Sequence, residues 1–260
     1  MKQAVLPKLA RAAGPPAVPL VLLAAWAIAA GRAGDAFLLP GPADVWRALL
    51  ELARSGRLAG GLLLSLARVC AGFLLAAACG VPLGILAGRS AWFTRASRGT
   101  LDFFRQVPAV ALVPLFILWF GLGEASKLVV IFYASFFPVF LAAELGAEQA
   151  DPLLVEAGRL YLRKPGAVLR RVILPSALPA LMTGLRLGVG YGWRSLVVAE
   201  MLAAARGLGA LIVEARGFGR TDAMLAGVLC IGAAGILLDR ALSAAERAVP
   251  WARRQEASRG

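Results

Sequence analysis

The chain has 260 residues, of which 60% are hydrophobic, and it carries a formal net charge of +13. A single soluble domain of this composition would expose large apolar patches to water, so the composition indicates an all-α protein that crosses a membrane several times. The basic residues lie between apolar stretches and form no patch interleaved with aromatic residues, which argues against nucleic-acid binding.

Residue types that are missing from the sequence exclude several kinds of chemistry. Histidine is absent, so the most common zinc ligand and acid–base residue is unavailable. No GxxxxGK[ST] phosphate loop occurs, so the chain is not expected to hydrolyse ATP through that motif. No metal site is expected either, because the three cysteines lack metal-ligand spacing. We predict that they are small buried hydrophobic residues: Cys70, Cys79 and Cys230.

Six apolar stretches are long enough to cross a hydrocarbon core about 30 Å thick. The first is interrupted by prolines at its start, and its basic flank also fits a cleaved signal peptide. We expect one membrane domain over residues 15–245, with cytosolic tails at 1–14 and 246–260. The predicted spans are approximately 15–31, 62–88, 101–120, 127–146, 176–204 and 223–242.

Basic residues are distributed unequally between the two sides of the membrane. With the N-terminus in the cytosol, the cytosolic segments carry about twice as many as the outer segments, so the positive-inside rule predicts that both chain ends are cytosolic. Residues 32–61 then lie outside, where the spacing of apolar residues predicts a short interfacial helix. The glycine-rich segment 205–222 is predicted to be an outer loop.

The most polar segment between spans, residues 151–175, lies in the cytosol in this topology. Asp151 followed by Pro152 predicts a helix start, and an apolar stripe follows it: Leu153, Leu154, Ala157, Leu160 and Tyr161. Pro165 and Gly166 predict a turn with a left-handed exit, before a second short helix. The residues alone leave two interpretations open, a loop on anionic lipid headgroups or a docking site for a soluble protein.

At this segment the sequence resembles a known family. Glu156-Ala157-Gly158, followed by Val172-Ile173-Leu174-Pro175, is similar to the EAA motif of permease subunits of bacterial ATP-binding-cassette importers, in the branch for nitrate, sulfonates and taurine. The likeness covers residues 38 to 240. Its other stretches are Leu39-Pro-Gly-Pro42, Ser65-Leu-Ala-Arg-Val69 with Gly72-Phe73, Gly80-Val-Pro-Leu-Gly84, Arg105-Gln-Val-Pro108 with Pro114, Trp119-Phe-Gly-Leu-Gly-Glu124 with Ser126-Lys127, Ser135-Phe-Phe-Pro138, Gly184-Leu-Arg186, Val198-Ala-Glu-Met201 and Gly207-Leu-Gly209.

The resemblance implies a type I importer permease, with six transmembrane helices and a cytosolic helix–turn–helix coupling segment, in the bacterial inner membrane. It implies a homodimer around the solute path, two cytosolic ATPase subunits that hold ATP and Mg, and an extracytoplasmic solute-binding protein. This chain would then hold no cofactor and catalyse no reaction. The residues it assigns to ATPase coupling are Glu156, Ala157, Gly158, Arg159, Leu162, Arg163, Pro165, Gly166, Leu174 and Pro175.

The motif departs from the family pattern at two positions. The family ordinarily has glycine where this chain has Leu162, and alanine where it has Gly158. A missing glycine at the bend would straighten the first helix. Our hypothesis is that Pro165 and Gly166 take over the turn.

Charged residues within the predicted spans are candidates for the solute path, because an ionised side chain at mid-bilayer costs about 2.5–3.5 kcal/mol on insertion scales. Arg186 and Glu200 are fourteen residues apart, close to four helical turns, and thus share a face, while Arg194 lies off that face by roughly a quarter to a third of a turn. We predict that this face lines the path. The alternative is that these residues snorkel or pair internally, with Glu200 as a structural partner and Arg105 as an interfacial anchor.

Prolines and glycines within the spans suggest positions for bending and close packing. Pro108, Pro114 and Pro138 are predicted to kink their helices, either as part of a gate or as passive packing features. The glycines of the fifth span form a small-residue face, compatible with a dimer seam or a moving gate: Gly184, Gly188, Gly190 and Gly192.

Two other classes of function compete with the importer permease. An ion-coupled secondary transporter predicts inverted repeats and midplane carboxylates, and neither is clear in the sequence. A membrane enzyme acting on lipid needs clustered catalytic residues near one interface, whereas the carboxylates here are scattered. The sequence does not identify the solute, but a small organic or inorganic anion such as a sulfonate, taurine or nitrate fits the resemblance.

Overall fold

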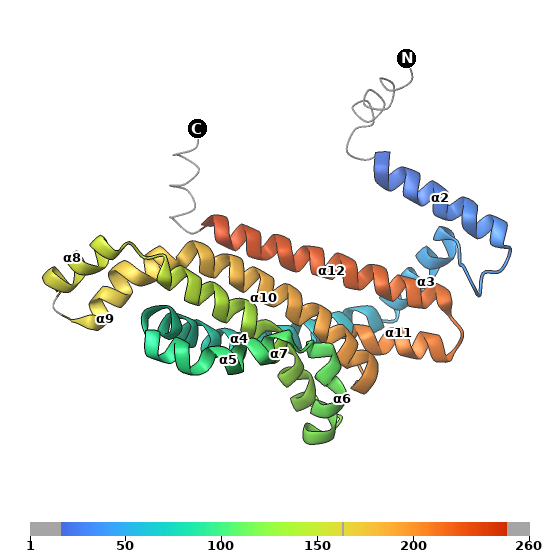
Figure 1. Cartoon of the computed structure of the whole chain (residues 1–260). Coiled ribbons are helices and arrows are strands. Elements are labelled where there is room, and N and C mark those ends of the chain that lie inside the picture. Colours follow the sequence, from blue (N-terminus) through green and yellow to red (C-terminus); the bar gives the residue numbers. More distant parts are fainter. Residues whose placement is uncertain (1–16, 163, 249–260) are drawn as a thin grey trace, which may run out of the picture. The chain divides into compact units, whose positions relative to one another are not determined.

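The computed structural model describes residues 17–162 and 164–248. The predicted tail at 1–14, most of the tail at 246–260, and Arg163 lie outside the described residues. Within these described ranges every regular element is helical, as predicted (Figure 1). The helices are α2 (Ala17–Ala33), α3 (Pro42–Arg54), α4 (Arg57–Arg89), α5 (Ala91–Gln106), α6 (Ala109–Phe120), α7 (Glu124–Glu148), α8 (Pro152–Leu162), α9 (Pro165–Val168), the π-helical turn η1 (Leu169–Ile173), α10 (Leu174–Ala203), α11 (Leu208–Gly217) and α12 (Thr221–Ala248).

Each of the six predicted spans coincides with apolar helix in the structure. Within the part of the chain that the structure describes, four helical segments are long and apolar enough to cross a membrane, and they contain α4, α7, α10 and α12. The helices α5 and α6 together make a fifth candidate if the bent pair is one span. The first predicted span corresponds to α2, an apolar helix of 17 residues, whereas the four long candidates have 25 to 39 residues.

The third predicted span is not one straight helix. Its two parts, α5 and α6, meet at an angle of 95° at Val107 and Pro108. Val107 is extended because the ring of a following proline disfavours the helical conformation, and Pro108 has no N–H to continue the helix. Pro114 and Pro138 lie inside α6 and α7 without ending these helices.

The described residues group into two compact units: one holds residues up to Ala59 together with Leu211–Cys230, and the other holds the described part of Gly60–Ala210 together with the residues from Ile231 onward. In the second unit, α7 and α10 form the most extensive helix pair. A Cβ added to Gly184 of α10 would lie 2.1 Å from Cβ of Ala142 in α7. The predicted small-residue face is therefore a seam within one chain, where missing side chains allow close approach. Gly190, by contrast, faces open space.

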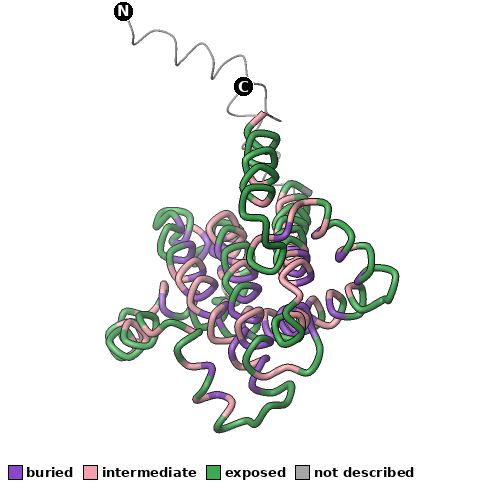
Figure 2. Tube along the Cα trace, turned by 90° about the vertical axis from the view of Figure 1, so that its right-hand side faces the viewer, coloured by how far each residue is buried: buried purple, intermediate pink, exposed green. Residues whose placement is uncertain are grey.

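Exposed positions predominate along many helices, and buried positions form narrower stripes (Figure 2). The prediction that the cysteines are buried is wrong for Cys70 and Cys79, which are exposed on α4, while Cys230 is intermediate. An exposed apolar residue on a membrane span faces lipid or another subunit rather than water, so apolar surroundings in the sequence do not establish burial within the chain.

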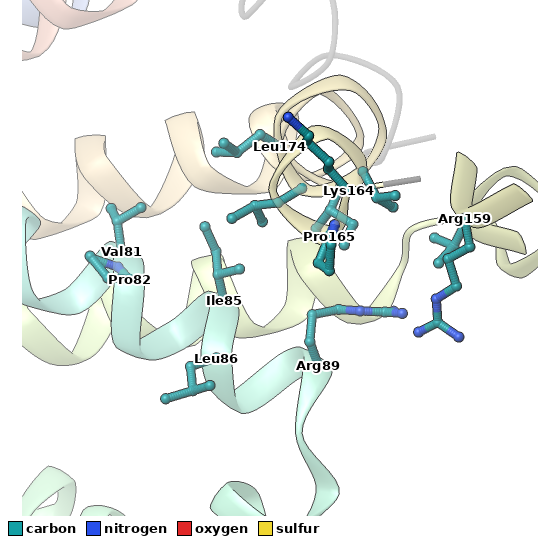
Figure 3. Close-up of a pocket in the computed structure, with 13 residues that line it drawn as sticks. Val81, Pro82, Ile85, Leu86, Arg89, Arg159, Lys164, Pro165 and Leu174 are labelled. Atoms are coloured by element: carbon teal, nitrogen blue, oxygen red, sulfur yellow. The ribbon is translucent and has the colours of Figure 1, made fainter. Parts of the chain in front are cut away.

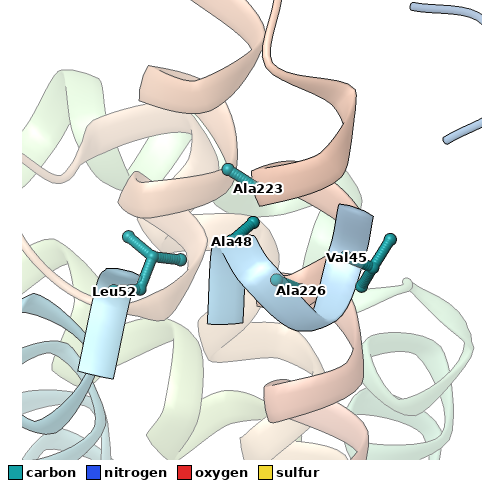
Figure 4. Packing of buried hydrophobic residues seen from close by; sticks show 5 residues of the cluster. All are labelled: Val45, Ala48, Leu52, Ala223 and Ala226. Atoms are coloured by element: carbon teal, nitrogen blue, oxygen red, sulfur yellow. The ribbon is translucent and has the colours of Figure 1, made fainter. Parts of the chain in front are cut away.

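The first unit contains the predicted interfacial helix, which is α3. Its apolar face, Val45, Ala48 and Leu52, packs against Ala223 and Ala226 of α12 (Figure 4). The segment 205–222 was predicted to be a loop, but it contains the helix α11. Its glycines lie at the ends of the segment, where they do not prevent a helix between them.

Ion pairs also join the elements of this unit. The guanidinium of Arg220 donates to both carboxylate oxygens of Glu51 at 2.8 and 2.9 Å. The hydrogen bonds and charge of Arg220 lower the pKa of Glu51 below its ordinary value. Both side chains are exposed, so water screens the pair and its contribution to stability is small.

Candidate functional site

The segment 151–175 forms two helices joined by a turn, as predicted. The carboxylate of Asp151 accepts a hydrogen bond from the backbone N–H of Leu153 at 2.8 Å, which caps α8. The chain turns between Leu162 and Pro165, and Pro165 starts α9 with Lys164 extended before it. The turn is therefore fixed by proline at the first helical position.

The second helix of this segment does not stop at Pro175. It continues from α9 through η1 into α10, so that residues Pro165–Ala203 form one long helical segment. Pro175 has no N–H to donate to the preceding turn, and the five residues of η1 adopt π-helical bonding, with Leu174 N–H donating to the carbonyl oxygen of Leu169. The segment is thus mechanically continuous with a membrane span.

The apolar stripe predicted for α8 is on its exposed face. Leu160 is 78% exposed and Tyr161 is 87% exposed. The buried face instead carries Val155 and Gly158, with Val155 packed in a cluster that includes Val168 of α9. Because the two faces lie on opposite sides of the helix, packing within the chain leaves the stripe uncovered.

Leu162 and Gly166 do not have the roles that sequence reasoning gave them. Leu162 is partly buried against the cluster that contains Val155, Val168 and Ile173, and α8 ends there without a glycine. Gly166 is helical within α9 and is absent from the residues with positive φ, so the predicted left-handed exit is wrong. The bend depends on Pro165 rather than on Gly166.

A groove lies between α8 and the start of α10. It has a volume of about 480 Å³, and its walls include Leu154, Ala157 and Tyr161 of α8 and Pro175 of α10. Glu156 is exposed on α8 and does not line this groove. Arg159 lies on the other side of α8 and lines a different cavity, together with Arg89 of α4 and Lys164. The predicted coupling residues therefore divide between two surfaces.

Glu200, predicted on the solute path, is only 1% exposed and lies in a buried ion-pair network. Its carboxylate accepts from the guanidinium of Arg68 at 2.7 Å, from the hydroxyl of Ser65 at 2.7 Å, and from the backbone N–H of Gly209 at 2.9 Å. Every oxygen of this carboxylate thus has a partner inside the chain, which offsets the cost of burying the charge.

The network continues to the start of α7. Arg68 binds both carboxylate oxygens of Glu124 at 2.6 Å, and the ammonium of Lys127 donates to the same carboxylate at 3.3 Å. Arg68 also donates to the backbone carbonyl oxygen of Arg206. The network therefore joins α4, α7, α10 and the segment before α11.

Sequence reasoning did not propose Arg68, Glu124 or Lys127 as site residues. The signal was present, since Arg68 is a single charge within the predicted span 62–88, where charge is costly without a partner. All three also occur in the stretches that carried the family resemblance. Their convergence required the fold, because Arg68 and Glu200 are 132 residues apart in sequence.

The other predicted path residues have different surroundings. Arg186 donates to both oxygens of Asp239 in α12 at 2.5 and 2.6 Å, so its charge is paired. Arg194 is exposed, and its guanidinium lies 5.6 Å from the ring centre of Tyr191, a cation–π distance. The face predicted to unite Arg186 and Glu200 is thus divided between contacts to two neighbouring helices.

Arg194 lines a cavity of about 630 Å³ beside the break between α5 and α6. Arg105 and Pro108 border this cavity, as do Pro138 of α7 and the ring of Tyr191. Arg105 also pairs with Asp102 at 3.2 Å. The fold thereby brings together two arginines and two prolines that sequence reasoning had singled out separately, whereas Pro114 does not line the cavity.

Residues 80–250 match the family described as binding-protein-dependent transport system inner membrane component. The chain belongs to this family. The permease is 38% identical over 231 residues to the putative aliphatic sulfonates transport permease protein SsuC of Bacillus subtilis, covering 88% of this chain and 84% of that protein.

Two further relatives agree with this placement. The permease is 36% identical to the taurine transport system permease protein TauC of Escherichia coli, covering 87% of this chain and 84% of that protein. It is 30% identical to the nitrate import permease protein NrtB of Synechocystis, covering 90% and 88%. The permease is thus a multi-pass inner-membrane subunit of an ATP-binding-cassette transporter, and not an enzyme.

Proposed function

We propose that the permease forms the path of an ATP-driven importer for a small anion such as a sulfonate, taurine or nitrate. The names of the relatives in Bacillus subtilis, Escherichia coli and Synechocystis support this class of solute. The cavity beside Pro108 supports it as well, because Arg194 gives that cavity positive charge, whereas the charge of Arg105 is paired with Asp102.

The observation that carries the proposed coupling role is the uncovered apolar stripe of α8. Exposure of Leu160 and Tyr161 to water is unfavourable, and a protein that covers these side chains lowers the free energy by burying their apolar surface. We assign the cover to a cytosolic ATPase subunit that holds ATP and Mg. Glu156 and Ala157 lie at this contact, and η1 passes movement from α8 to α10.

The assembly around the permease follows from the same proposal. Two copies of the permease enclose the path, each copy binds one ATPase subunit, and both chain ends are cytosolic. An extracytoplasmic solute-binding protein delivers the anion to the outer face. ATP binding closes the ATPase pair, and this movement turns the cavity outward through α8.

Fewer residues are assigned to the solute path than the sequence suggested. Arg194 is the residue we place on the path, because its exposed guanidinium borders the cavity at the helix break. Arg186 and Glu200 are assigned to stability, since Asp239 and Arg68 take up their charges. Pro108 is assigned to the gate because it separates α5 from α6.

The coupling proposal is tested with two substitutions on the stripe, Leu160→Ser and Tyr161→Ser, in the complete reconstituted complex. Removing these contacts should lower solute-stimulated ATP hydrolysis about tenfold or more, because buried apolar and aromatic anchors dominate binding. The matched control is Trp92→Ser, an exposed apolar residue at the start of α5. Unchanged stimulation in the stripe variant, or an equal loss in the control, would contradict the assignment.

A further inference from the structure

A cavity beside the coupling segment is separate from both the α8 stripe and the cavity at Arg194. It has a volume of about 900 Å³ and lies between the end of α4 and the helices α8, α9 and η1. This volume is within the usual range for small-molecule sites, about 300–1,000 Å³. Neither the family match nor the relatives' names assign anything to it.

The floor of this cavity is apolar. Val81, Ile85 and Leu86 of α4 line it, and Figure 3 shows Val81 and Ile85 on the side of α4 that faces Leu174. Leu86 is 46% exposed, although it is a large aliphatic side chain. A surface of this kind suits a hydrocarbon chain, which gains free energy by covering apolar area.

The rim of the cavity is cationic. Arg89 ends α4, Arg159 comes from α8, and Lys164 precedes α9. The lining contains no carboxylate. Among the described residues none of these three side chains takes part in a salt bridge, although other cations of the chain do. In Figure 3 the guanidinium groups of Arg89 and Arg159 lie toward each other, whereas the side chain of Lys164 points toward the side of Leu174. A bound anion offsets the repulsion between the two guanidinium groups.

The position of the cavity indicates that the anion is a lipid headgroup. The candidate span α4 ends at Arg89, α7 ends shortly before α8, and α10 begins after η1. The cationic rim therefore lies where membrane spans end, at the level of lipid headgroups, and the apolar floor lies along a span. Basic pockets between spans at a membrane surface bind anionic phospholipids.

We infer that this cavity binds one anionic phospholipid, with its phosphate at Arg89 and Arg159, Lys164 adding positive charge to the lining, and an acyl chain on α4. The bound lipid joins the end of a span to the coupling segment. It neutralises the rim and holds α8 against α4, so lipid composition sets how firmly the coupling segment is placed. The stripe of α8 stays free for its protein partner, because Arg159 is on the other side of the helix.

The binding test uses the full-length permease in detergent, with native mass spectrometry to count bound lipids. The probes are dioleoyl phosphatidylglycerol and the zwitterionic dioleoyl phosphatidylcholine. The inference predicts one tightly bound phosphatidylglycerol and no equivalent phosphatidylcholine. The variant Arg89→Gln, Arg159→Gln, Lys164→Gln should bind phosphatidylglycerol roughly a hundredfold more weakly, since each cation near the surface contributes about 1 kcal/mol.

The matched control removes the same charge elsewhere, with Arg95→Gln, Arg170→Gln and Arg240→Gln, three exposed cations outside this cavity. It should bind as the unaltered chain does. Equal losses in the two triple variants would overturn the inference, because they would show general charge attraction. All six positions are exposed, and the melting temperature of each variant reports whether it folds. If the triple variant unfolds, Arg89→Gln alone replaces it, with a predicted loss of about fivefold.

Two further arms separate a lipid from other anions. Leu86→Gln should weaken phosphatidylglycerol binding and leave inorganic phosphate binding unaltered. If inorganic phosphate competes as well as the lipid at equal concentration, the site is a headgroup site and the acyl-chain assignment is wrong. If the rim variant keeps its lipid but loses the ATPase subunit, the rim is a protein contact and the inference fails. Lipid binding is measured on the permease alone, so the effect of Leu160→Ser and Tyr161→Ser on ATP hydrolysis neither supports nor contradicts the lipid site.

Discussion

Arg68 and Glu200 show how the chain keeps charge inside an apolar unit. Arg68 is only 5% exposed, yet all of its hydrogen-bonding groups point to oxygens of Glu124, Glu200 and Arg206. Removing one partner of a buried pair is costlier than removing both, because the remaining charge is left without a partner. A single substitution in the network is therefore expected to destabilise the fold more than the removal of both charges of a pair.

The substitution Arg68→Met should lower the unfolding free energy by about 3–5 kcal/mol, because it leaves the buried carboxylate of Glu200 uncompensated. The added substitution Glu200→Gln should recover part of this loss by removing the charge. Melting temperatures of the purified permease in detergent measure both effects. Arg47→Met, at an exposed arginine, is the control. A double variant no more stable than Arg68→Met would contradict the account of the network.

A second residue-scale prediction concerns the bend after α8. Leu162→Gly restores the residue that the family ordinarily has, but it removes a side chain from the cluster around Val155. It should lower solute-stimulated ATP hydrolysis several-fold, since α8 loses about 1–2 kcal/mol of packing when a partly buried leucine is deleted. Gly166→Ala should have no effect, because Gly166 is helical and faces open space.

The outcomes of this pair distinguish two explanations of the bend. If Leu162→Gly raises the stimulation, the family's glycine geometry is better and the packing account is wrong. If Gly166→Ala lowers it, the left-handed turn expected from the sequence exists in the working complex. Pro165→Ala should loosen the bend, because it removes the ring that holds Lys164 extended.

At the scale of elements, the pairing of α7 with α10 depends on glycines at the seam. Gly184→Ala would place a Cβ 2.1 Å from Cβ of Ala142, so the helices must separate. We expect a loss of about 1–3 kcal/mol from this overpacking. Gly190→Ala is the matched control on the same helix. It has no neighbour within 4 Å and should raise stability slightly, since alanine favours helix over glycine.

Melting temperatures of the two variants give the comparison. A loss in Gly184→Ala with none in Gly190→Ala is the predicted result. Equal effects would mean that helix propensity alone decides and that the seam has no steric role. If Gly190→Ala instead blocks assembly of two copies, then that face of α10 is the dimer seam that the glycine pattern also allowed.

The length of the apolar stretches predicted the long helices well, because a membrane span must satisfy its backbone hydrogen bonds internally and so follows a simple length rule. It did not place α11, since glycines at the ends of that segment concealed a helix between them. The stripe of α8 was found correctly as apolar, but the sequence does not reveal whether the chain itself covers it. The answer depended on Val155 and Gly158, which pack on η1 and α9.

At the scale of the whole molecule, the candidate site could be predicted only in part. The coupling residues between Glu156 and Pro175 were assigned from the family resemblance, which a short continuous stretch of sequence carries. The buried network was not, because Ser65, Arg68, Glu124 and Glu200 come from three helices. Charges in an apolar stretch indicate that partners exist, but a sequence does not say which helix supplies them.

The central claim is that ATP hydrolysis on a partner subunit drives solute through this permease. The most direct measurement is uptake of a labelled sulfonate into proteoliposomes that contain the permease, its ATPase subunit and its solute-binding protein. The account predicts uptake only with ATP and Mg, and none with a non-hydrolysable analogue or without the binding protein. Uptake that persists without ATP and follows an ion gradient would contradict it.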